Sequence, residues 1–275
     1  MIWLALLACA PKGEGTVDTA DTSAAPVGTS SWTGSGTGST ATGGTPTGAS
    51  IPTSTTTGAP SGPARADEVV HAPGADSGPF RDAVLAINGV RGGGASSGSL
   101  DVYGVGLSPG DDVLVLGWSD RRVIDSEGVD LVVFENPFDT GPTSRFMDPA
   151  VVEVSPDGED YVAFPTAYLA DDPGAWSADP RHWVGFAGVT PTLRHAEDNP
   201  VDPLGPDAGG DGFDLADLPE DNPVTARVWA EGVVAVRITS ASVHVDPNTG
   251  ATYPRDPVSN GPDIDGVWAR ALVPR

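Results

Sequence analysis

The sequence contains little cysteine and little basic charge. Its only cysteine is Cys9, so no disulfide can form within the chain. Lys12 is the single lysine among 14 basic residues, which face 38 acidic ones and leave a formal net charge of −24. Nucleic acids and anionic membrane surfaces are bound by clustered Lys and Arg, so the composition disfavours both as partners. A large acidic excess suits a solvent-facing surface or the binding of cations.

Complete catalytic and metal-binding motifs are also missing. The four histidines show neither an HExxH motif nor close metal spacing. Residues 94–98 (GASSG) match the letters of a nucleophile elbow, but no hydrophobic strand leads into this glycine- and serine-rich loop and no helix follows it. Residues 246–250 (DPNTG) are only a fragment of a calcium-binding EF-hand loop, and they predict a β-turn.

The chain begins with a short apolar run, MIWLALLAC. The run is too short to span a bilayer. With Leu6 three residues before Cys9 and Ala8 directly before it, the run resembles a bacterial lipobox, which implies removal of residues 1–8 and lipidation of Cys9. The absence of Lys and Arg before the run departs from a signal peptide, and a cleaved secretory signal or a chance match are the alternatives. Because Ala10 stands where an Asp would retain a lipoprotein in the inner membrane, we expect the outer membrane or cell surface, with the lipid as the only membrane contact.

Residues 9–65 consist almost entirely of Gly, Ser, Thr, Pro and Ala. A segment of this composition buries too little apolar surface to offset the entropy lost on ordering. The sequence therefore predicts a disordered tether, followed by one domain over residues 66–275.

The domain contains short β-rich runs separated by Gly, Pro, Asp and Ser turns, which predicts an all-β fold. The expected strands are residues 83–87, 100–107, 112–118, 130–135, 150–155, 161–164, 233–245 and 264–273. One short helix is expected, in residues 213–218.

The expected strand 130–135 (DLVVFE) has an acid at each end of an apolar run. Side chains alternate faces along a strand, so Asp130 and Glu135 point to opposite faces. We expect Asp130 to cap or solvate the start of the strand. Glu135 closes a run that is apolar on both faces, and a carboxylate there needs a partner. Arg122, Arg237 and a metal ion are the candidates.

Other acids cluster near expected strand ends. If a helix begins near residue 213, Asp214 and Asp217 share a face and Asp211 caps its start. Asp263 and Asp265 lie two apart at the head of a strand, hence on one face. Carboxylate and carbonyl oxygens are the ligands that Ca²⁺ takes, six to eight at a time. Solvated turn residues are the alternative interpretation of each single acid.

An ordered set of segments across residues 77–272 resembles a family of bacterial surface proteins that includes myxobacterial-type lipoproteins with long Ser/Thr/Gly tethers. The segments include VDLVVFENPF, AVVEVSPDGEDYVAFP, DGFDLADL, VAVRITSASV and GPDIDGVWARAL. The pair VEVSPDG and VRITS is also similar to the discoidin and carbohydrate-binding jelly rolls of the galactose-binding-like fold.

This resemblance implies a single jelly-roll β-sandwich, in which a structural Ca²⁺ is frequent. We expect Glu135, Asp214, Asp263 and Asp265 to join in one cation site or hydrogen-bonded cluster. The full set of candidate metal ligands is Asp130, Glu135, Asp211, Asp214, Asp263 and Asp265. Pro137 and Pro262 depart from the family pattern.

The predicted function is a lipid-anchored, non-catalytic surface module that binds a carbohydrate or a surface protein. Sugar rings stack on aromatic faces, and Trp176 and Trp183 lie in a Pro/Asp-rich loop where they could provide such a platform. Packing beneath that loop is the alternative for each tryptophan. A polysaccharide hydrolase that uses Glu135 and Glu153 as acid and base, or a purely structural envelope protein, are the competing functions.

Overall fold

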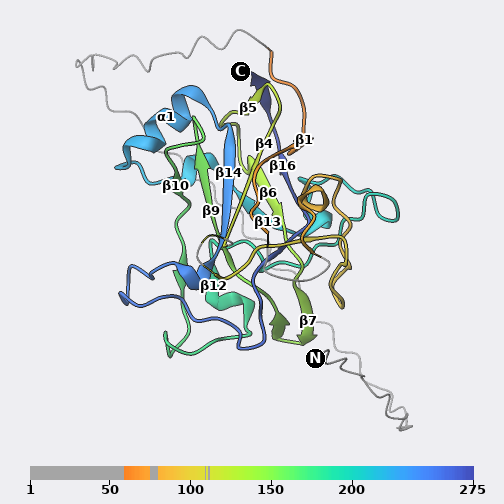
Figure 1. Ribbon diagram of the computed structural model, residues 1–275, viewed down its shortest axis with the longest axis vertical. Coiled ribbons are helices and arrows are strands. Elements are labelled where there is room, and N and C mark those ends of the chain that lie inside the picture. Colours follow the sequence, from red (N-terminus) through yellow and green to blue (C-terminus); the bar gives the residue numbers. More distant parts are fainter. Residues whose placement is uncertain (1–58, 75–79, 109, 111) are drawn as a thin grey trace, which may run out of the picture. The chain divides into compact units, whose positions relative to one another are not determined.

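The computed structural model describes residues 59–74, 80–108, 110 and 112–275 (Figure 1). The expected leader, the lipidation site Cys9 and most of the expected tether lie outside the described residues. Backbone pairing begins at Ser61, which forms a bridge with Leu272, and continues into β1 (Ala64–Arg65). These residues fall within the range expected to be tether.

The larger sheet is antiparallel and five-stranded, in the order β10-β9-β14-β4-β2 (Figure 1). Its strands are β2 (Glu68–His71), β4 (Val113–Gly117), β9 (Ala150–Ser155), β10 (Val162–Ala163) and β14 (Ala235–Ser240). Val236 lies opposite Leu116 on one side and Val154 on the other, and all three are fully buried. Alternate residues of the β-branched runs thus build one apolar face.

The second sheet is four-stranded, in the order β1-β16-β6-β13. It contains β6 (Leu131–Phe134), β13 (Asp211–Phe213) and β16 (Gly266–Ala269) beside β1. Leu131 and Val133 join the main core, which also contains the inner side chains of the five-stranded sheet. Val132 and Phe134 pack on the other face in a smaller cluster with Val90. Burial on both faces explains why the run carries no polar residue between its two acids.

Eight further strands form four two-stranded pairs. They are β3 (Tyr103–Gly104) with β15 (Asp263–Ile264), β5 (Arg121–Val123) with β17 (Leu272–Pro274), β7 (Phe138–Gly141) with β8 (Ser144–Phe146), and β11 (Ala167–Tyr168) with β12 (Trp183–Val184). The described chain is therefore mostly β, as predicted, and its two main sheets share one core. The strand order does not establish a jelly roll.

Two expected elements are of a different type in the structure, and the expected strands 100–107, 233–245 and 264–273 are strand over only part of their length. Residues 83–87 were expected to form a strand, but Ala83–Ala86 is a 3₁₀ helix (η1), because the Asp82 carboxylate accepts a hydrogen bond from the Val84 amide and caps it. The expected helix at 213–218 is the shorter 3₁₀ helix η4 (Leu215–Asp217), and its N-cap is Asp214 rather than Asp211. Asp211 is instead the first residue of β13, the strand that precedes η4. The other 3₁₀ helices are η2 (Pro180–His182), η3 (Pro206–Ala208) and η5 (Ala241–Val243).

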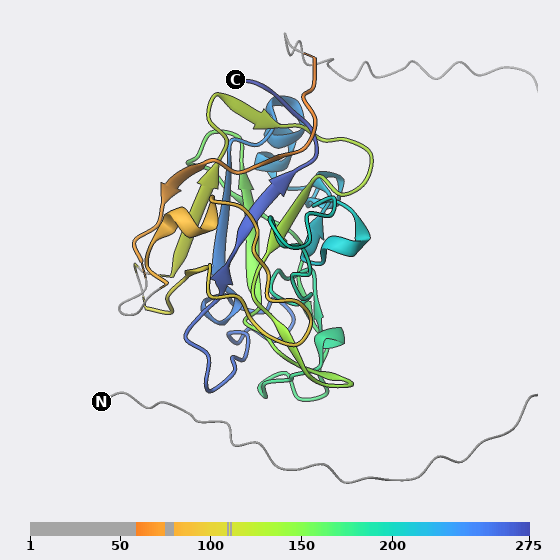
Figure 2. The ribbon, with the colours of Figure 1, turned by 90° about the vertical axis from the view of Figure 1, so that its right-hand side faces the viewer.

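The α-helix α1 (Pro223–Glu231) was not predicted. Asn222 caps it, Pro223 occupies its first turn, and Gly232 follows it with a φ of 83°. This Asn-Pro start and glycine stop are the local signals that identify the helix. Both views place α1 near one end of the main strands and the β7–β8 hairpin near the other (Figures 1 and 2). In the part of the chain that the structure describes, no helix is long and apolar enough to cross a membrane.

Candidate functional site

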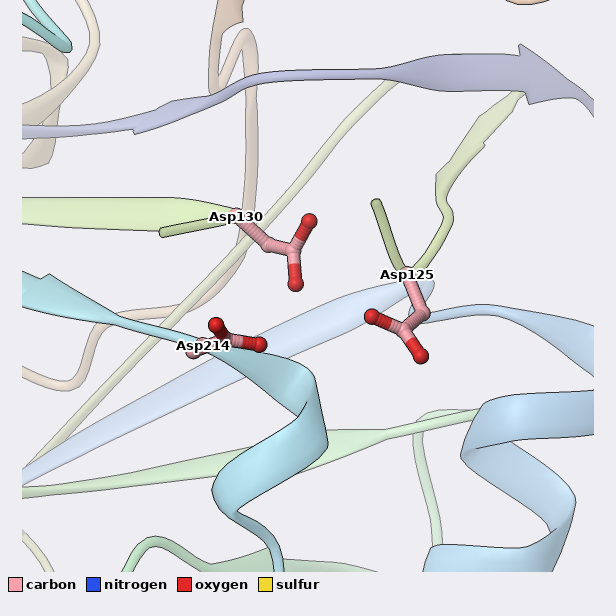
Figure 3. Close-up of side chains that lie close together, drawn as sticks. All are labelled: Asp125, Asp130 and Asp214. Carbon is pink, nitrogen blue, oxygen red and sulfur yellow. The ribbon is translucent and has the colours of Figure 1, made fainter. Parts of the chain in front are cut away.

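Three aspartates converge at one end of β6. Each of Asp125, Asp130 and Asp214 offers a carboxylate oxygen, and these oxygens all lie within 4.8 Å of one another. Figure 3 shows the three side chains pointing toward a shared space from three elements. Asp125 follows β5, Asp130 directly precedes β6, and Asp214 caps η4. Because β13 pairs with β6, the amide of Asp130 donates to the carbonyl of Phe213 at 2.9 Å, which brings Asp214 beside it.

Hydrogen bonds fix the orientation of this aspartate group. Asp130 is fully buried, and its Oδ1 accepts from the amide and hydroxyl of Ser126 at 2.9 and 2.6 Å. Its Oδ2 accepts from the Leu215 amide at 2.9 Å. Asp214 accepts from the Ala216 amide at 2.9 Å. The prediction that Asp130 caps the strand entrance is therefore refined, because its partners belong to the preceding loop and to η4.

The electrostatics of the aspartate group favour a cation. Burial raises the pKa of Asp130, and hydrogen bonds from Ser126 oppose that rise. The pKa of Asp125 is also raised, first by burial and then by the negative charge of Asp214. None of the ion pairs among the described residues involves these three carboxylates. Hard carboxylate oxygens at this spacing could hold a metal ion, with the remaining ligands supplied by water or main-chain oxygens.

Glu135 lies at the opposite end of β6. Its side chain is buried, and its Oε1 accepts from the Asp263 amide at 2.9 Å, while its Oε2 has no hydrogen-bond partner among the described residues. Burial and the nearby charge of Asp148 raise its pKa well above the usual range. Neither arginine suggested by the sequence reaches it: Arg237 pairs with Glu153, and Arg122 donates to the carbonyl of Glu231.

Asp148 and Asp263 complete this buried acidic group. Burial raises the pKa of Asp148 to about 7, the Ser259 hydroxyl opposes the rise, and the charges of Asp263 and Asp256 add to it. Burial likewise raises the pKa of Asp263 to about 6. Asp148 was not predicted as a site residue, although an acid two residues before the buried run 150–155 was a usable signal.

The other two predicted ligands bind main-chain amides. Asp211 Oδ2 accepts from the amides of Val189 and Thr190 at 2.9 and 3.2 Å. Both carboxylate oxygens of Asp265 accept from the Arg91 amide at 2.9 Å. Burial is the main reason that their pKa values rise, to about 6 for Asp211 and about 7 for Asp265.

The structure thus divides the acids that were expected to form one cation site. Asp214 lies with Asp130 and Asp125, whereas Glu135, Asp263 and Asp265 lie outside that group. The reason is strand register, since β13 delivers Asp214 to the start of β6, while Gly266 of β16 lies opposite Phe134 at its end. Five residue steps of about 3.3 Å place the two ends roughly 16 Å apart.

The two predicted ligand-binding tryptophans differ in exposure. Trp183 is only 3% exposed and packs among Met147, Tyr168 and Phe186, so it presents no free face to a ligand. Trp176 is half-buried, with its ring centroid 5.0 Å from that of Trp183. It also lines a narrow pocket. The other lining residues are Asp148, Pro149, Ser240, Ala241, Ser242, Pro254, Arg255, Asp256 and Ser259.

The carboxylates of the hydrolase hypothesis have separate environments. Glu153 accepts two hydrogen bonds of 2.6 Å from Arg237, whose guanidinium lies 4.0 Å from the ring centroid of Tyr161. Glu135 instead contacts Asp263 at the end of β6. Each of the two therefore has its own structural partner.

Two hydroxyl–histidine contacts were not anticipated from the sequence. Ser177 Oγ lies 2.7 Å from His182 Nδ1, and Thr239 Oγ1 lies 2.5 Å from His244 Nε2. Among the hydrogen bonds of the described residues, no carboxylate binds the other ring nitrogen of either histidine, so the third member of a nucleophilic triad is absent there. Residues 94–98 form an irregular loop between Arg91 and Ser99, as predicted.

No protein-family model matches this chain, and comparisons with curated proteins and with solved structures also gave no match.

Proposed function

We propose that this protein is a lipid-anchored, non-catalytic binding module of the bacterial cell surface, and that a structural Ca²⁺ stabilises its β domain. The observation that carries the calcium assignment is the convergence of Asp125, Asp130 and Asp214 within 4.8 Å. The lipobox-like sequence before Cys9 supports the anchor, and the Ser/Thr/Gly-rich segment that follows supports a spacer between membrane and domain.

The proposed cation connects two segments that hydrogen bonds also join. Asp125 and Asp130 flank the loop between β5 and β6, and Asp214 begins η4. An ion that binds all three carboxylates ties this loop to the β13–η4 connection. Such an ion stabilises the fold because it binds the folded state and finds no preformed site in the unfolded chain.

A ligand-binding role is supported by the pocket beside Trp176. The pocket combines a half-buried aromatic ring with carboxylates and serine hydroxyls, which is the mixture that polar ligands require. A carbohydrate or a surface protein remains the proposed partner. The jelly-roll topology implied by the sequence resemblance is also part of this proposal; the two antiparallel sheets around one core are compatible with it.

The calcium assignment predicts a shift in thermal stability. We expect Ca²⁺ at about ten times its Kd to add about 1.4 kcal/mol to the free energy of unfolding relative to EDTA, which raises the Tm by roughly 3–5 °C for a domain of this size. Thermal unfolding of the full chain, followed by circular dichroism in EDTA and with increasing Ca²⁺, measures the shift.

Asp125→Asn should remove most of this shift, because Asp125 is the exposed member of the group. Glu127→Gln is the matched control, since it removes one exposed acid from the same loop. If the parent protein shows no Ca²⁺-dependent shift, or if both variants lose it equally, the calcium assignment is wrong and the aspartates serve only as hydrogen-bond acceptors for the loop and η4.

A further inference from the structure

The pocket beside Trp176 is small and negatively charged. Its cavity volume is about 10 Å³, close to the least space that holds one water molecule. Asp148 and Asp256 are the acids in its wall, and Arg255 is the one basic residue there. Arg255 is exposed, and none of the ion pairs in the described part of the chain joins it to either acid.

Buried carboxyl groups that have no basic partner lie behind the pocket wall. Glu135 is buried next to Asp148, and its Oε2 has no hydrogen-bond partner among the described residues. The two residues meet at Gly188, where an added Cβ would lie 2.7 Å from the carbonyl oxygen of Asp148 and 3.2 Å from Glu135 Oε2. Asp263 adds a third carboxyl, which has a hydrogen bond with the Asn136 side chain but no basic partner among the described ion pairs. Buried acids without a counter-charge attract a cation strongly.

The spacing of these acids does not favour a bare metal ion. Asp148 does not belong to any described group of three carboxylate or histidine ligand atoms within 4.8 Å of one another. A primary ammonium group needs fewer carboxylates close together than a metal ion does, because one carboxylate and one or two hydroxyl oxygens accept its three N–H donors. Ser240, Ser242 and Ser259 provide hydroxyls in the same wall, and Trp176 lines the pocket with an aromatic ring, a group that attracts cations.

We propose that the Asp148–Trp176 pocket binds the primary ammonium group of a ligand, with Asp148 as its carboxylate acceptor. The inference rests on the proposed role as a binding module and names the chemistry of its ligand. The remainder of the ligand has room in the adjoining hollow of about 390 Å³, which shares Ser242, Pro254 and Arg255 with the pocket.

Two pairs of probes test this by calorimetric titration of the full chain. Nα-acetyl-lysine methylamide is compared with its neutral analogue Nα-acetyl-norleucine methylamide, and glucosamine with N-acetylglucosamine. We expect an ammonium compound to bind and its neutral partner to fail. Binding by the lysine derivative indicates an amino-acid side chain as the natural source, and binding by glucosamine indicates an amino sugar.

Variants assign the binding to the pocket. Asp148→Asn should weaken binding at least about tenfold, because a charged acceptor is lost. It should leave the fold intact, since it relieves repulsion with Asp263 and Glu135. Arg255→Gln should strengthen binding by removing the one positive charge in the wall. Asp171→Asn is the matched control, because Asp171 is exposed in the loop before Trp176 and does not line the pocket.

Binding should also be tighter at pH 8 than at pH 6, because the pKa of Asp148 is about 7 and the ammonium of the lysine probe stays protonated over this range. The charged groups that face Asp148 are Glu135, Asp256, Asp263 and Arg255.

Equal binding of charged and neutral probes, or unchanged binding in Asp148→Asn, overturns the proposal. A competition experiment with Ca²⁺ gives a further test. If Ca²⁺ displaces the amine from the parent protein but not from Asp125→Asn, the amine binds at the aspartate group at the start of β6, and the proposal is overturned. Absence of amine binding leaves the Ca²⁺-dependent rise in Tm unaffected, so the two proposals fail independently.

Discussion

We expect that lowering the pH from 8 to 5 will stabilise the domain, which is the reverse of the behaviour expected from paired surface carboxylates. The main cause is the buried group formed by Glu135, Asp148 and Asp263, and the raised pKa values of the buried Asp211 and Asp265 add to it. The pKa of Asp148 is about 7 in the folded protein, compared with about 3.9 for an aspartate in an unfolded chain. Between these values the folded state binds more protons than the unfolded state, so the free energy of unfolding falls as the pH rises.

The expected effect is large. One pKa unit corresponds to about 1.4 kcal/mol, so the group should lower the free energy of unfolding by on the order of 3 kcal/mol between pH 5 and pH 8. Urea denaturation of the full chain in EDTA at pH 5, 6, 7 and 8 measures this slope without a contribution from bound cations. The range ends at pH 5 because Asp157 and Asp179 have pKa values below the usual range, lowered chiefly by hydrogen bonds, and their contribution is lost only in stronger acid.

Glu135→Gln assigns the slope to the buried group. The amide oxygen can still accept from the Asp263 amide, and the uncharged side chain removes the repulsion with Asp148 and Asp263. We expect the variant to be more stable than the parent at pH 8, by about 1–3 kcal/mol, and less dependent on pH. Glu127→Gln, an exposed change of the same type, should have neither effect. A destabilised Glu135→Gln protein with an unchanged slope would show that Glu135 is ionised and stabilised in the fold.

Gly261→Ala should destabilise the domain by at least about 3 kcal/mol, because strain and a steric overlap act together. Gly261 has a φ of +116°, and an added Cβ would lie 1.9 Å from the carbonyl oxygen of Val105. The following residue, Pro262, accepts a 2.7 Å hydrogen bond from the Val105 amide and leads into β15 with Asp263. The substitution therefore also disturbs the strand that brings Asp263 to Glu135.

Gly250→Ala separates strain from overlap. Gly250 also has a positive φ, +72°, but no atom lies within 4 Å of its added Cβ. Conformational strain alone should cost about 1–2 kcal/mol there. Denaturant titration of both variants gives the difference, and equal losses would show that the Val105 carbonyl can move aside.

The sequence predicted correctly those features that depend on a single strand. The run 131–134 predicted a strand buried on both faces, and all four residues are buried. It also placed Asp130 and Glu135 on opposite faces. What it did not show was which distant acids join each end, because that depends on β13 and β16 pairing antiparallel with β6. The expectation that Glu135 and Asp214 share one site was therefore wrong, because the two residues lie at opposite ends of β6. The expectation that aspartates converge near a strand end is confirmed by Asp125, Asp130 and Asp214.

Local competition explains the other differences. Residues 83–87 have strand-like composition, but the cap from Asp82 turns them into η1. Trp183 lies in a polar segment that suggested exposure, yet its indole N–H donates to the carbonyl of Ser177 while the ring packs against Tyr168 and Phe186. In both cases specific contacts decided the structure, and composition alone carries no information about such contacts.

The outermost strands of the two main sheets are all short. β1 and β10 have two residues each, β13 has three, and β2 has four with an irregular register between Val69 and His71. A long, flat outer strand is the usual template on which another molecule adds its own strand. These edges offer few consecutive free amides and carbonyls, so copies of the domain brought close together at high density should remain separate molecules rather than polymerise through their sheets.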